Sequence, residues 1–242
     1  MGTTAVMDRN AESSPRLKAR IAGVFYLFTF LMAGISALVG GRLEVSGNAA
    51  ATANNILAHP ALFRLGFAAD LSVVACYIAV TALFYELFKP VNRSISLLAA
   101  FFSLAGCAIQ AGICLFHLAP FVVLGGAQYL SVFKVEQLQA LVYMFFELYA
   151  QGFTICFVLF GFYCLLIGYL IFRSSFLPRF LGVLMAIGGL GWLTFLYPPL
   201  ADSLWPYITA PGILGEGSLT LWLLMMGVNS GQWKQQASAG RE

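Results

Sequence analysis

Charged side chains are scarce in this sequence. Asp, Glu, Lys and Arg make up 10% of the 242 residues and hydrophobic residues make up 60%, whereas about a quarter of a soluble domain is charged. This shortage excludes an ordinary soluble fold, because a soluble core cannot absorb so much apolar sequence. Each membrane crossing takes about 20 mostly apolar residues, so the length allows several crossings. The net charge of +3 is too small to indicate a nucleic-acid partner.

Residues that hold metals or carry out catalysis are also few. Neither of the two histidines lies in a His-Glu-x-x-His or Glu-x-x-His pattern, and no Walker or dinucleotide-binding glycine motif is present. The five cysteines lie in apolar runs without Cys-x-x-Cys spacing, which indicates packing residues rather than a disulfide framework or a thiolate metal site; they are Cys76, Cys107, Cys114, Cys156 and Cys164. The motifs therefore predict no catalytic residue, no cofactor site and no metal ligand.

What the sequence does have is a series of long apolar runs. Six of them are long enough to be membrane-spanning helices, at residues 20–41, 64–88, 95–118, 141–172, 179–197 and 212–228. The last two are rich in glycine and flanked by prolines, which stand where helices should start or stop. The predicted fold is an all-α polytopic membrane protein, a bundle of six transmembrane helices with short interfacial helices on the extracytoplasmic side.

The two ends of the chain are polar. We expect residues 1–15 to be a disordered N-terminus, residues 16–233 to form the membrane domain and residues 234–242 to form a short tail. The first apolar run, 21–39, is too long for the core of a cleaved signal peptide, so we expect an uncleaved first helix.

Basic residues predict the orientation, because Lys and Arg stay preferentially on the cytoplasmic side. Ten of them fall on the side of the termini and three on the other side, namely Arg42, Arg64 and Lys134. Both termini are therefore predicted to be cytoplasmic, in agreement with an even number of spans. The lipid bilayer of the cell membrane is the predicted environment.

The extracytoplasmic connections are longer than the cytoplasmic turns. Ser46 or Asn48 is expected to cap a short alanine-rich helix that ends before Pro60. Pro120 is expected to end the third span, and Ser131 to cap the next helix. The last connection, 197–212, is expected to be a loop whose aromatic residues lie at the headgroup level.

The fourth span is longer than a bilayer requires. Residues 135–172 would measure about 57 Å as one helix, against a hydrocarbon core of about 30 Å. The helix must therefore protrude, tilt or break near Gly152.

Polar side chains recur at helical spacing within the spans and should face the bundle interior. Counted from the cytoplasmic basic residues at about 1.5 Å per residue, they fall in the outer third of the bilayer or its outer interface. We predict an outward-facing polar cavity, lined by Asp70, Glu147, Glu216, Gln110, Gln151 and His117, with Arg42 and Arg64 at its mouth. In the structural alternative, Arg42 and Arg64 pair with Asp70 and Glu147. Because Arg64 and Asp70 differ by about 120° around a helix, any partner of Asp70 should come from another helix.

Four separated runs resemble the bacterial membrane proteins of the domain-of-unknown-function 4386 family. They are GRLEVSGNAAATANNILAHPALFRLGFAADL (41–71), LFKPVNRSISLLAAFFSL (87–104), FLPRFLGVLMAIGGLGWLTFL (176–196) and YITAPGILGEGSLTLWLLMMGVN (207–229). The resemblance implies an integral protein of the bacterial cytoplasmic membrane, and it implies no activity and no catalytic residue. The chain departs from the family pattern at Asn48 and Pro60, where an acid is usual, which argues against a charge-based role for that connection.

Three functions fit these observations. The first is binding or transport of a small solute, ion or lipid ligand, with the membrane acids as proton or cation sites. The second is a non-catalytic partner or scaffold subunit of a membrane complex. The third is a membrane-embedded enzyme that acts on a lipid-like substrate, with an acid and with His117 as general base. Glycines of the fifth span (Gly182, Gly188, Gly189 and Gly191) fit either a broken helix at a binding site or close helix packing.

Overall fold

The computed structural model describes residues 14–239, apart from the side chains of residues 202 and 206. Within this range the chain contains helices and no strand. The helices are α1 (Pro15–Leu43), α2 (Ala49–Ala58), α3 (Pro60–Phe88), α4 (Arg93–Leu124), α5 (Val135–Arg173), α6 (Arg179–Leu193), α7 (Pro198–Met225) and α8 (Ser230–Ala239), with short 3₁₀ turns η1 (Gln128–Leu130) and η2 (Thr194–Leu196). Six of the helices in the described part are long and apolar enough to cross a membrane: α1, α3, α4, α5, α6 with η2, and α7 from Tyr207 onward. The predicted fold class is confirmed.

The helix starts follow local sequence rules. Asn48 and Asn92 precede α2 and α4, and their side-chain oxygens accept hydrogen bonds from the backbone N–H groups of Ala51 and Ile95. Each bond satisfies a donor that has no partner inside its helix. A proline stands in the first turn of α1, α3 and α7, where the missing N–H costs nothing. The predicted interfacial helix with an Asn48 cap is therefore present as α2.

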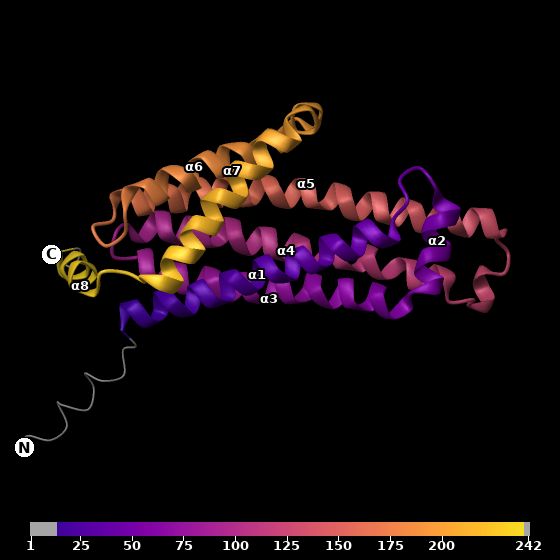
Figure 1. Cartoon of the computed structure of the whole chain (residues 1–242), viewed down its shortest axis with the longest axis horizontal. Helices are drawn as coiled ribbons and strands as arrows, with labels where there is room; N and C mark the ends of the chain where they lie inside the picture. The colour runs from indigo at the N-terminus through magenta and orange to yellow at the C-terminus, as the bar shows by residue number, and fades with distance from the viewer. Residues whose placement is uncertain (1–13, 240–242) are drawn as a thin grey trace, which may run out of the picture.

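The spanning helices contact one another in chain order: α1 packs on α3, α3 on α4, α4 on α5, α5 on α6, α6 on α7, and α7 returns to α1. These six helices form an elongated bundle, and Figure 1 shows α2 and α8 at its opposite ends. We call the end with α8 and the start of α1 the terminal end, and the other the α2 end. Most of the buried apolar side chains form one core toward the terminal end, and a smaller core lies under α2.

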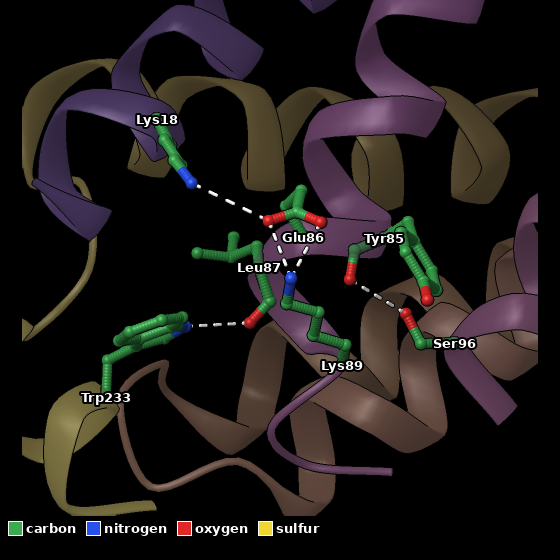
Figure 2. A network of polar contacts seen from close by, with 7 residues as sticks. All are labelled: Lys18, Tyr85, Glu86, Leu87, Lys89, Ser96 and Trp233. Atoms are coloured by element: carbon green, nitrogen blue, oxygen red, sulfur yellow. Dashed lines mark hydrogen bonds and ion pairs between the residues drawn. The ribbon is translucent and has the colours of Figure 1, made fainter. Parts of the chain in front are cut away.

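Basic and aromatic side chains hold the terminal end together (Figure 2). Glu86, at the end of α3, accepts hydrogen bonds from Lys89 at 2.8 Å and lies 3.6 Å from the ammonium group of Lys18 on α1. The indole N–H of Trp233 on α8 donates to the carbonyl of Leu87 at 2.8 Å. These contacts join α1, α3 and α8 at one point.

Glycines allow α6 to pack closely against both of its neighbours. A Cβ added to Gly168 of α5 would lie 2.7 Å from the carbonyl oxygen of Gly182 on α6, and one added to Gly189 would lie 2.8 Å from the carbonyl oxygen of Gly161. On the other side, a Cβ at Gly188 would lie 3.2 Å from the Cα of Gly212 on α7. The glycines of α6 therefore support close packing, and α6 itself is continuous.

Several local predictions are wrong. Pro120 does not end the third span, because α4 continues to Leu124; a proline removes only one backbone donor, and a long membrane helix tolerates this loss. Ser131 does not cap α5, whose N-cap is Lys134. The connection 197–212 is helical from Pro198 onward. Pro198 and Pro199 stand in the first turn, where prolines are well tolerated, and α7 also continues through Pro211. The predicted C-terminal tail begins inside α8, and the predicted disordered segment 1–15 lies outside the described residues except for its last two.

The long fourth span is a single unbroken helix. Helix α5 has 39 residues, about 58 Å at 1.5 Å per residue, and runs most of the length of the molecule in Figure 1. Gly152 does not break it. A Cβ at this position would collide with Ile113 of α4, so Gly152 brings α4 and α5 into close contact.

The glycine contacts lead to a stability prediction. Gly168→Ala should lower the free energy of unfolding by about 1–3 kcal/mol, because its methyl group has to displace the backbone of α6. Thermal unfolding in a mild detergent measures this. Gly34→Ala on α1 is the matched control: no atom lies within 4 Å of its added Cβ, so stability should be unchanged or slightly raised. Equal unfolding midpoints for the two variants would contradict the packing role of Gly168.

Candidate functional site

Asp70 is the centre of a buried polar cluster near the α2 end. It is 2% exposed and lies 18 residues before the end of α3, about 27 Å along the helix. The hydroxyl of Ser36 on α1 donates to its Oδ1 at 2.5 Å, and the phenol of Tyr149 on α5 donates to its Oδ2 at 2.6 Å. His117 Nδ1 on α4 lies 2.9 Å from the same Oδ2. We call Ser36, Asp70, His117 and Tyr149 the Asp70 cluster; it joins four helices.

The partners of Asp70 all come from other helices, as predicted, but none of them is an arginine. Arg64 is exposed and its guanidinium lies 5.5 Å from the ring centre of Phe121. Arg42, at the end of α1, is exposed too, and in the described part of the chain neither arginine forms an ion pair with an acid. The predicted pairing of Arg42 and Arg64 with Asp70 and Glu147 is therefore wrong. The charge of Asp70 is met by an imidazole and two hydroxyl groups.

His117 uses only one of its two ring nitrogens. The carboxylate at Nδ1 favours a proton on that atom, which leaves Nε2 as an acceptor. Nε2 is buried and has no hydrogen-bond partner among the described residues. Aromatic rings surround the imidazole, with centroid distances of 4.7 Å to Phe63, 6.0 Å to Phe67 and 5.2 Å to Tyr149. A buried polar atom without a partner is rare and marks His117 as a candidate for function.

Glu216 of α7 forms a second cluster with donors from four other helices. Its Oε2 accepts from the phenols of Tyr26 on α1 at 2.5 Å and Tyr77 on α3 at 3.2 Å. Its Oε1 accepts from the indole N–H of Trp192 on α6 at 3.3 Å and lies 3.8 Å from the thiol of Cys164 on α5. We call these five residues the Glu216 cluster. In the described part of the chain no basic side chain forms an ion pair with Glu216.

The Glu216 cluster lies deeper in the bundle than predicted. Glu216 is nine residues from the end of α7 and Tyr77 is 11 residues from the end of α3, which places both about 14–17 Å from the terminal end. The predicted depth, in the outer third of the bilayer, is wrong for Glu216. A count along the sequence from the next basic residue, Lys234, overestimates the depth, because Lys234 belongs to α8 beyond the turn at Gly227. In a hydrocarbon core of about 30 Å, the Glu216 cluster is near the middle.

Helix α3 carries polar groups of both clusters on its buried side. Asp70 and Tyr77 are seven residues apart, so they lie on one face of the helix about 10 Å from each other. Four residues further, Thr81 lies 2.5 Å from Ser103 of α4, hydroxyl to hydroxyl. This side of α3 therefore carries polar groups from the α2 end to the terminal half of the bundle.

The remaining predicted site residues do not join either cluster. Gln110 is 6% exposed, on the buried side of α4. Gln151 and Glu147 are exposed on α5. Burial, and after it the negative charge of Glu147, raise the pKa of Glu44.

Three of the hydrogen-bond donors carry no signal in the sequence. Tyr149, Trp192 and Cys164 were not predicted as site residues, because an aromatic or a cysteine in an apolar run carries no motif. Ser36, Tyr26 and Tyr77 do lie on polar faces at helical spacing, and this spacing is the available signal.

Two surface hollows lie outside both clusters. One, of about 350 Å³, lies at the α2 end between α2, the end of α4 and the start of α5, and its lining includes Leu57, Val123 and Leu138. The other, of about 620 Å³, lies at the terminal end beside Arg16, Phe176 and Asn229. Neither is lined by Asp70 or Glu216, so the acids are held in side-chain networks away from these hollows.

Comparison with known proteins identifies a family. A family model described as Domain of unknown function (DUF4386) matches residues 21–227. The chain belongs to this family. The match includes every residue of the Asp70 and Glu216 clusters. No curated protein and no solved structure matches the chain.

Membership of the DUF4386 family indicates no chemistry, because the family is described as a domain of unknown function. The chemistry of this chain is therefore inferred from the two clusters. Within residues 14–239 no group of three or more His, Cys, Asp or Glu side chains could hold a metal ion together. The six apolar helices imply a lipid bilayer environment. Two carboxylates buried in such helices are therefore the strongest functional candidates of this multi-pass membrane protein.

Substitution of the two acids near the α2 end, Asp70 and Glu147, should have different effects on stability. Asp70→Asn should lower the free energy of unfolding by about 2–4 kcal/mol, because three partners lose a buried carboxylate. Glu147→Gln, which changes an exposed acid on the same end of the bundle, should stay within about 0.5 kcal/mol of the parent. Thermal unfolding in detergent gives both values. A loss for Glu147→Gln as large as for Asp70→Asn would contradict the assignment of Asp70 as the buried centre.

Proposed function

We propose that the protein binds and moves a small ion or solute across the bilayer, with the Asp70–His117 pair as its proton site. The observation that carries this proposal is the Nδ1–Oδ2 contact of 2.9 Å at membrane depth together with the unpartnered Nε2. Ionisable groups are costly in hydrocarbon, and they mark ion pathways and proton relays in membrane proteins. A proton reaches Nε2 only through a hydrogen-bonded group, so a water molecule has to enter between the surrounding rings for the pair to exchange its proton.

The proton chemistry of the pair is simple. A proton that binds Nε2 turns the neutral imidazole into an imidazolium, whose charge is matched by the Asp70 carboxylate. If the Nδ1 proton then passes to Oδ2, the products are a neutral imidazole with its proton on Nε2 and a neutral carboxyl group. Ser36 and Tyr149 hold the carboxylate in place for this exchange. The pair can thus accept a proton on one side and present it on the other.

The polar side of α3 supports a route away from the pair. Tyr77, and beyond it the Thr81–Ser103 contact, follow Asp70 toward the terminal end. Proton relays use such series of hydroxyl and carboxyl groups in otherwise apolar helices. Movement from Asp70 to Tyr77 spans about 10 Å along α3, so it requires a change in the bundle rather than a direct hydrogen bond.

We also infer that the terminal end faces the cytoplasm in the cell membrane of a bacterium. Support comes from the basic side chains at this end, which lie at the start of α1, in the two short turns and on α8: Arg16, Lys18, Arg20, Lys89, Arg93, Arg173, Arg179 and Lys234. Short loops rich in Lys and Arg remain on the cytoplasmic side.

Proton movement in liposomes tests the proposed function. Vesicles that hold Na⁺, K⁺ and the pH dye pyranine are diluted into buffer free of both cations with valinomycin, so that an outward cation gradient and a negative interior both drive proton entry. Wild-type protein should acidify the interior faster than protein-free vesicles do. Asp70→Asn and His117→Gln should each lower the protein-dependent rate by about tenfold or more, since positioned acids and bases contribute at least this much to proton transfer.

Glu136→Gln is the control for this assay, because Glu136 is exposed in the first turn of α5 and belongs to neither cluster. It should acidify at the wild-type rate. Circular dichroism and gel filtration establish that each variant is folded before its rate is compared. A wild-type rate equal to that of protein-free vesicles, or a folded His117→Gln variant at full rate, would contradict the proposal.

The orientation has its own test. Lys134→Cys at the α2 end and Lys234→Cys on α8 both place a thiol at an exposed position, whereas four native cysteines are buried and Cys76 is half-buried inside α3. A membrane-impermeant maleimide should label Lys134→Cys in right-side-out vesicles. It should label Lys234→Cys only after detergent is added. The opposite pattern would place the termini outside.

A further inference from the structure

The Glu216 cluster differs from the Asp70 cluster in what balances its charge. Asp70 has an imidazole at 2.9 Å. The groups around Glu216 are two phenols, an indole and a thiol, all of them neutral donors. An ionised carboxylate near the middle of a bilayer needs a counter-charge. Since in the described part of the chain no basic side chain supplies it by an ion pair, a proton or a cation from outside must do so.

The arrangement of oxygens suits a small metal cation. Glu216 Oε2 lies 2.5 Å and 3.2 Å from the phenol oxygens of Tyr26 and Tyr77, and these two oxygens lie 3.4 Å apart. Hard cations without directional preference select such clusters of oxygen ligands. A cation bound here would replace the hydrogen bonds that the two phenols donate to the carboxylate, with their oxygens turned toward the cation. The single negative charge of one carboxylate is balanced by one monovalent cation.

A buried phenol beside the cluster provides an independent observation. Tyr163 is 1% exposed, and its hydroxyl has no hydrogen-bond partner among the described residues. Its ring centre lies 5.9 Å from that of Tyr77. A buried hydroxyl without a partner is costly. Tyr163 directly precedes Cys164, whose thiol lies 3.8 Å from Glu216 Oε1, so its hydroxyl is the candidate for a further ligand beside Glu216, Tyr26 and Tyr77.

We propose that Glu216, Tyr26, Tyr77 and Tyr163 bind a small monovalent metal cation of the size of Na⁺, in exchange for the proton of the Glu216 carboxyl group. One cation binds, one proton leaves, and the charge of the cluster is unchanged. This inference rests on the proposed function, because it supplies the ion that is exchanged against protons handled by Asp70 and His117. Binding by itself does not depend on transport, so the two can fail separately.

Among the described residues, the titratable groups that contact Glu216 are Tyr26 of α1, Tyr77 of α3 and Cys164 of α5. Tyr163 of α5 packs against the ring of Tyr77, and Trp192 of α6 does not titrate. Protons and cations compete for the carboxylate, so the cation effect should be strongest in alkaline buffer. It should disappear when acid fully protonates Glu216.

Thermal unfolding in a mild detergent tests binding directly. Wild-type protein is heated at alkaline pH in 100 mM NaCl, LiCl or KCl and, for reference, in 100 mM N-methyl-D-glucamine chloride, which has equal ionic strength. We expect Na⁺ to raise the unfolding midpoint by about 5 °C over the reference, as ligand binding to the folded state alone requires. Glu216→Gln should show no difference between the salts, and Glu136→Gln should respond as the wild type does.

Milder variants keep the test decisive if Glu216→Gln does not fold. Tyr26→Phe and Tyr163→Phe each remove one oxygen and preserve the ring. In each variant, the Na⁺ concentration that produces half of the maximal shift in unfolding midpoint should therefore be about tenfold higher than in the wild type. Equal midpoints of the wild type in all four salts would overturn the inference. So would a Na⁺ response that survives unchanged in Glu216→Gln or in both phenylalanine variants.

A second measurement separates this inference from the proposed function. Proteoliposomes loaded with pyranine receive an inward Na⁺ gradient without a membrane potential, and outward proton movement is followed. If Na⁺ shifts the midpoint through Glu216 but no proton flux depends on Asp70, the cation site holds and the transport proposal fails. If flux depends on Asp70 but no salt changes the midpoint, the transport proposal holds and the cation site is overturned.

Discussion

An acid side chain inside a membrane must be solvated by the protein, and this constraint shapes the bundle. Asp70 is surrounded by Ser36, His117 and Tyr149, which come from α1, α4 and α5. Each donor has to sit within about 3 Å of a carboxylate oxygen. The four helices can meet this condition only in one register, so the cluster fixes how they stand beside one another. Replacement of the donors by water is not available in hydrocarbon.

The second acid extends the same constraint to the remaining helices. Glu216 on α7 is bonded to α1, α3, α5 and α6, so the two clusters together contact all six spans. Glycine contacts between α5, α6 and α7 provide the short interhelical distances that bring Trp192 and Glu216 together. A Cβ at Gly212 would collide with the Trp192 ring, which is therefore held against α7 one turn before Glu216. The contact between α6 and α7 is thus stabilised both by the close packing that Gly212 allows and by the hydrogen bond from Trp192 to Glu216.

The sequence was sufficient for the fold class and for much of the placement of polar groups. Apolar length identifies the spans, and helical spacing identifies Asp70 and His117 as inward-facing, because both signals arise within one helix. The partners of each acid depend on which helices are neighbours and on their register, which a single helix does not encode. Arg42 and Arg64 appeared as partners by charge alone, whereas Tyr149 and Trp192, which do form the bonds, carry no charge. The depth of Glu216 is not predictable from a residue count, because the turn at Gly227 separates α7 from α8 and a count along the sequence treats them as one helix.

The two clusters differ in the group that can balance the negative charge of their acid. Asp70 has a titratable base beside it, so a proton can be held by the pair and moved between a nitrogen and an oxygen without an ion from outside. Among the described residues Glu216 has only neutral donors, so in our proposal its counter-charge is a proton or a cation that arrives from solution and leaves again. Both acids are tied to α3, directly through Asp70 and through the phenol of Tyr77. A shift of α3 along its axis would therefore alter the hydrogen bonds of both acids at once, which is the mechanical link that exchange of one ion for another requires.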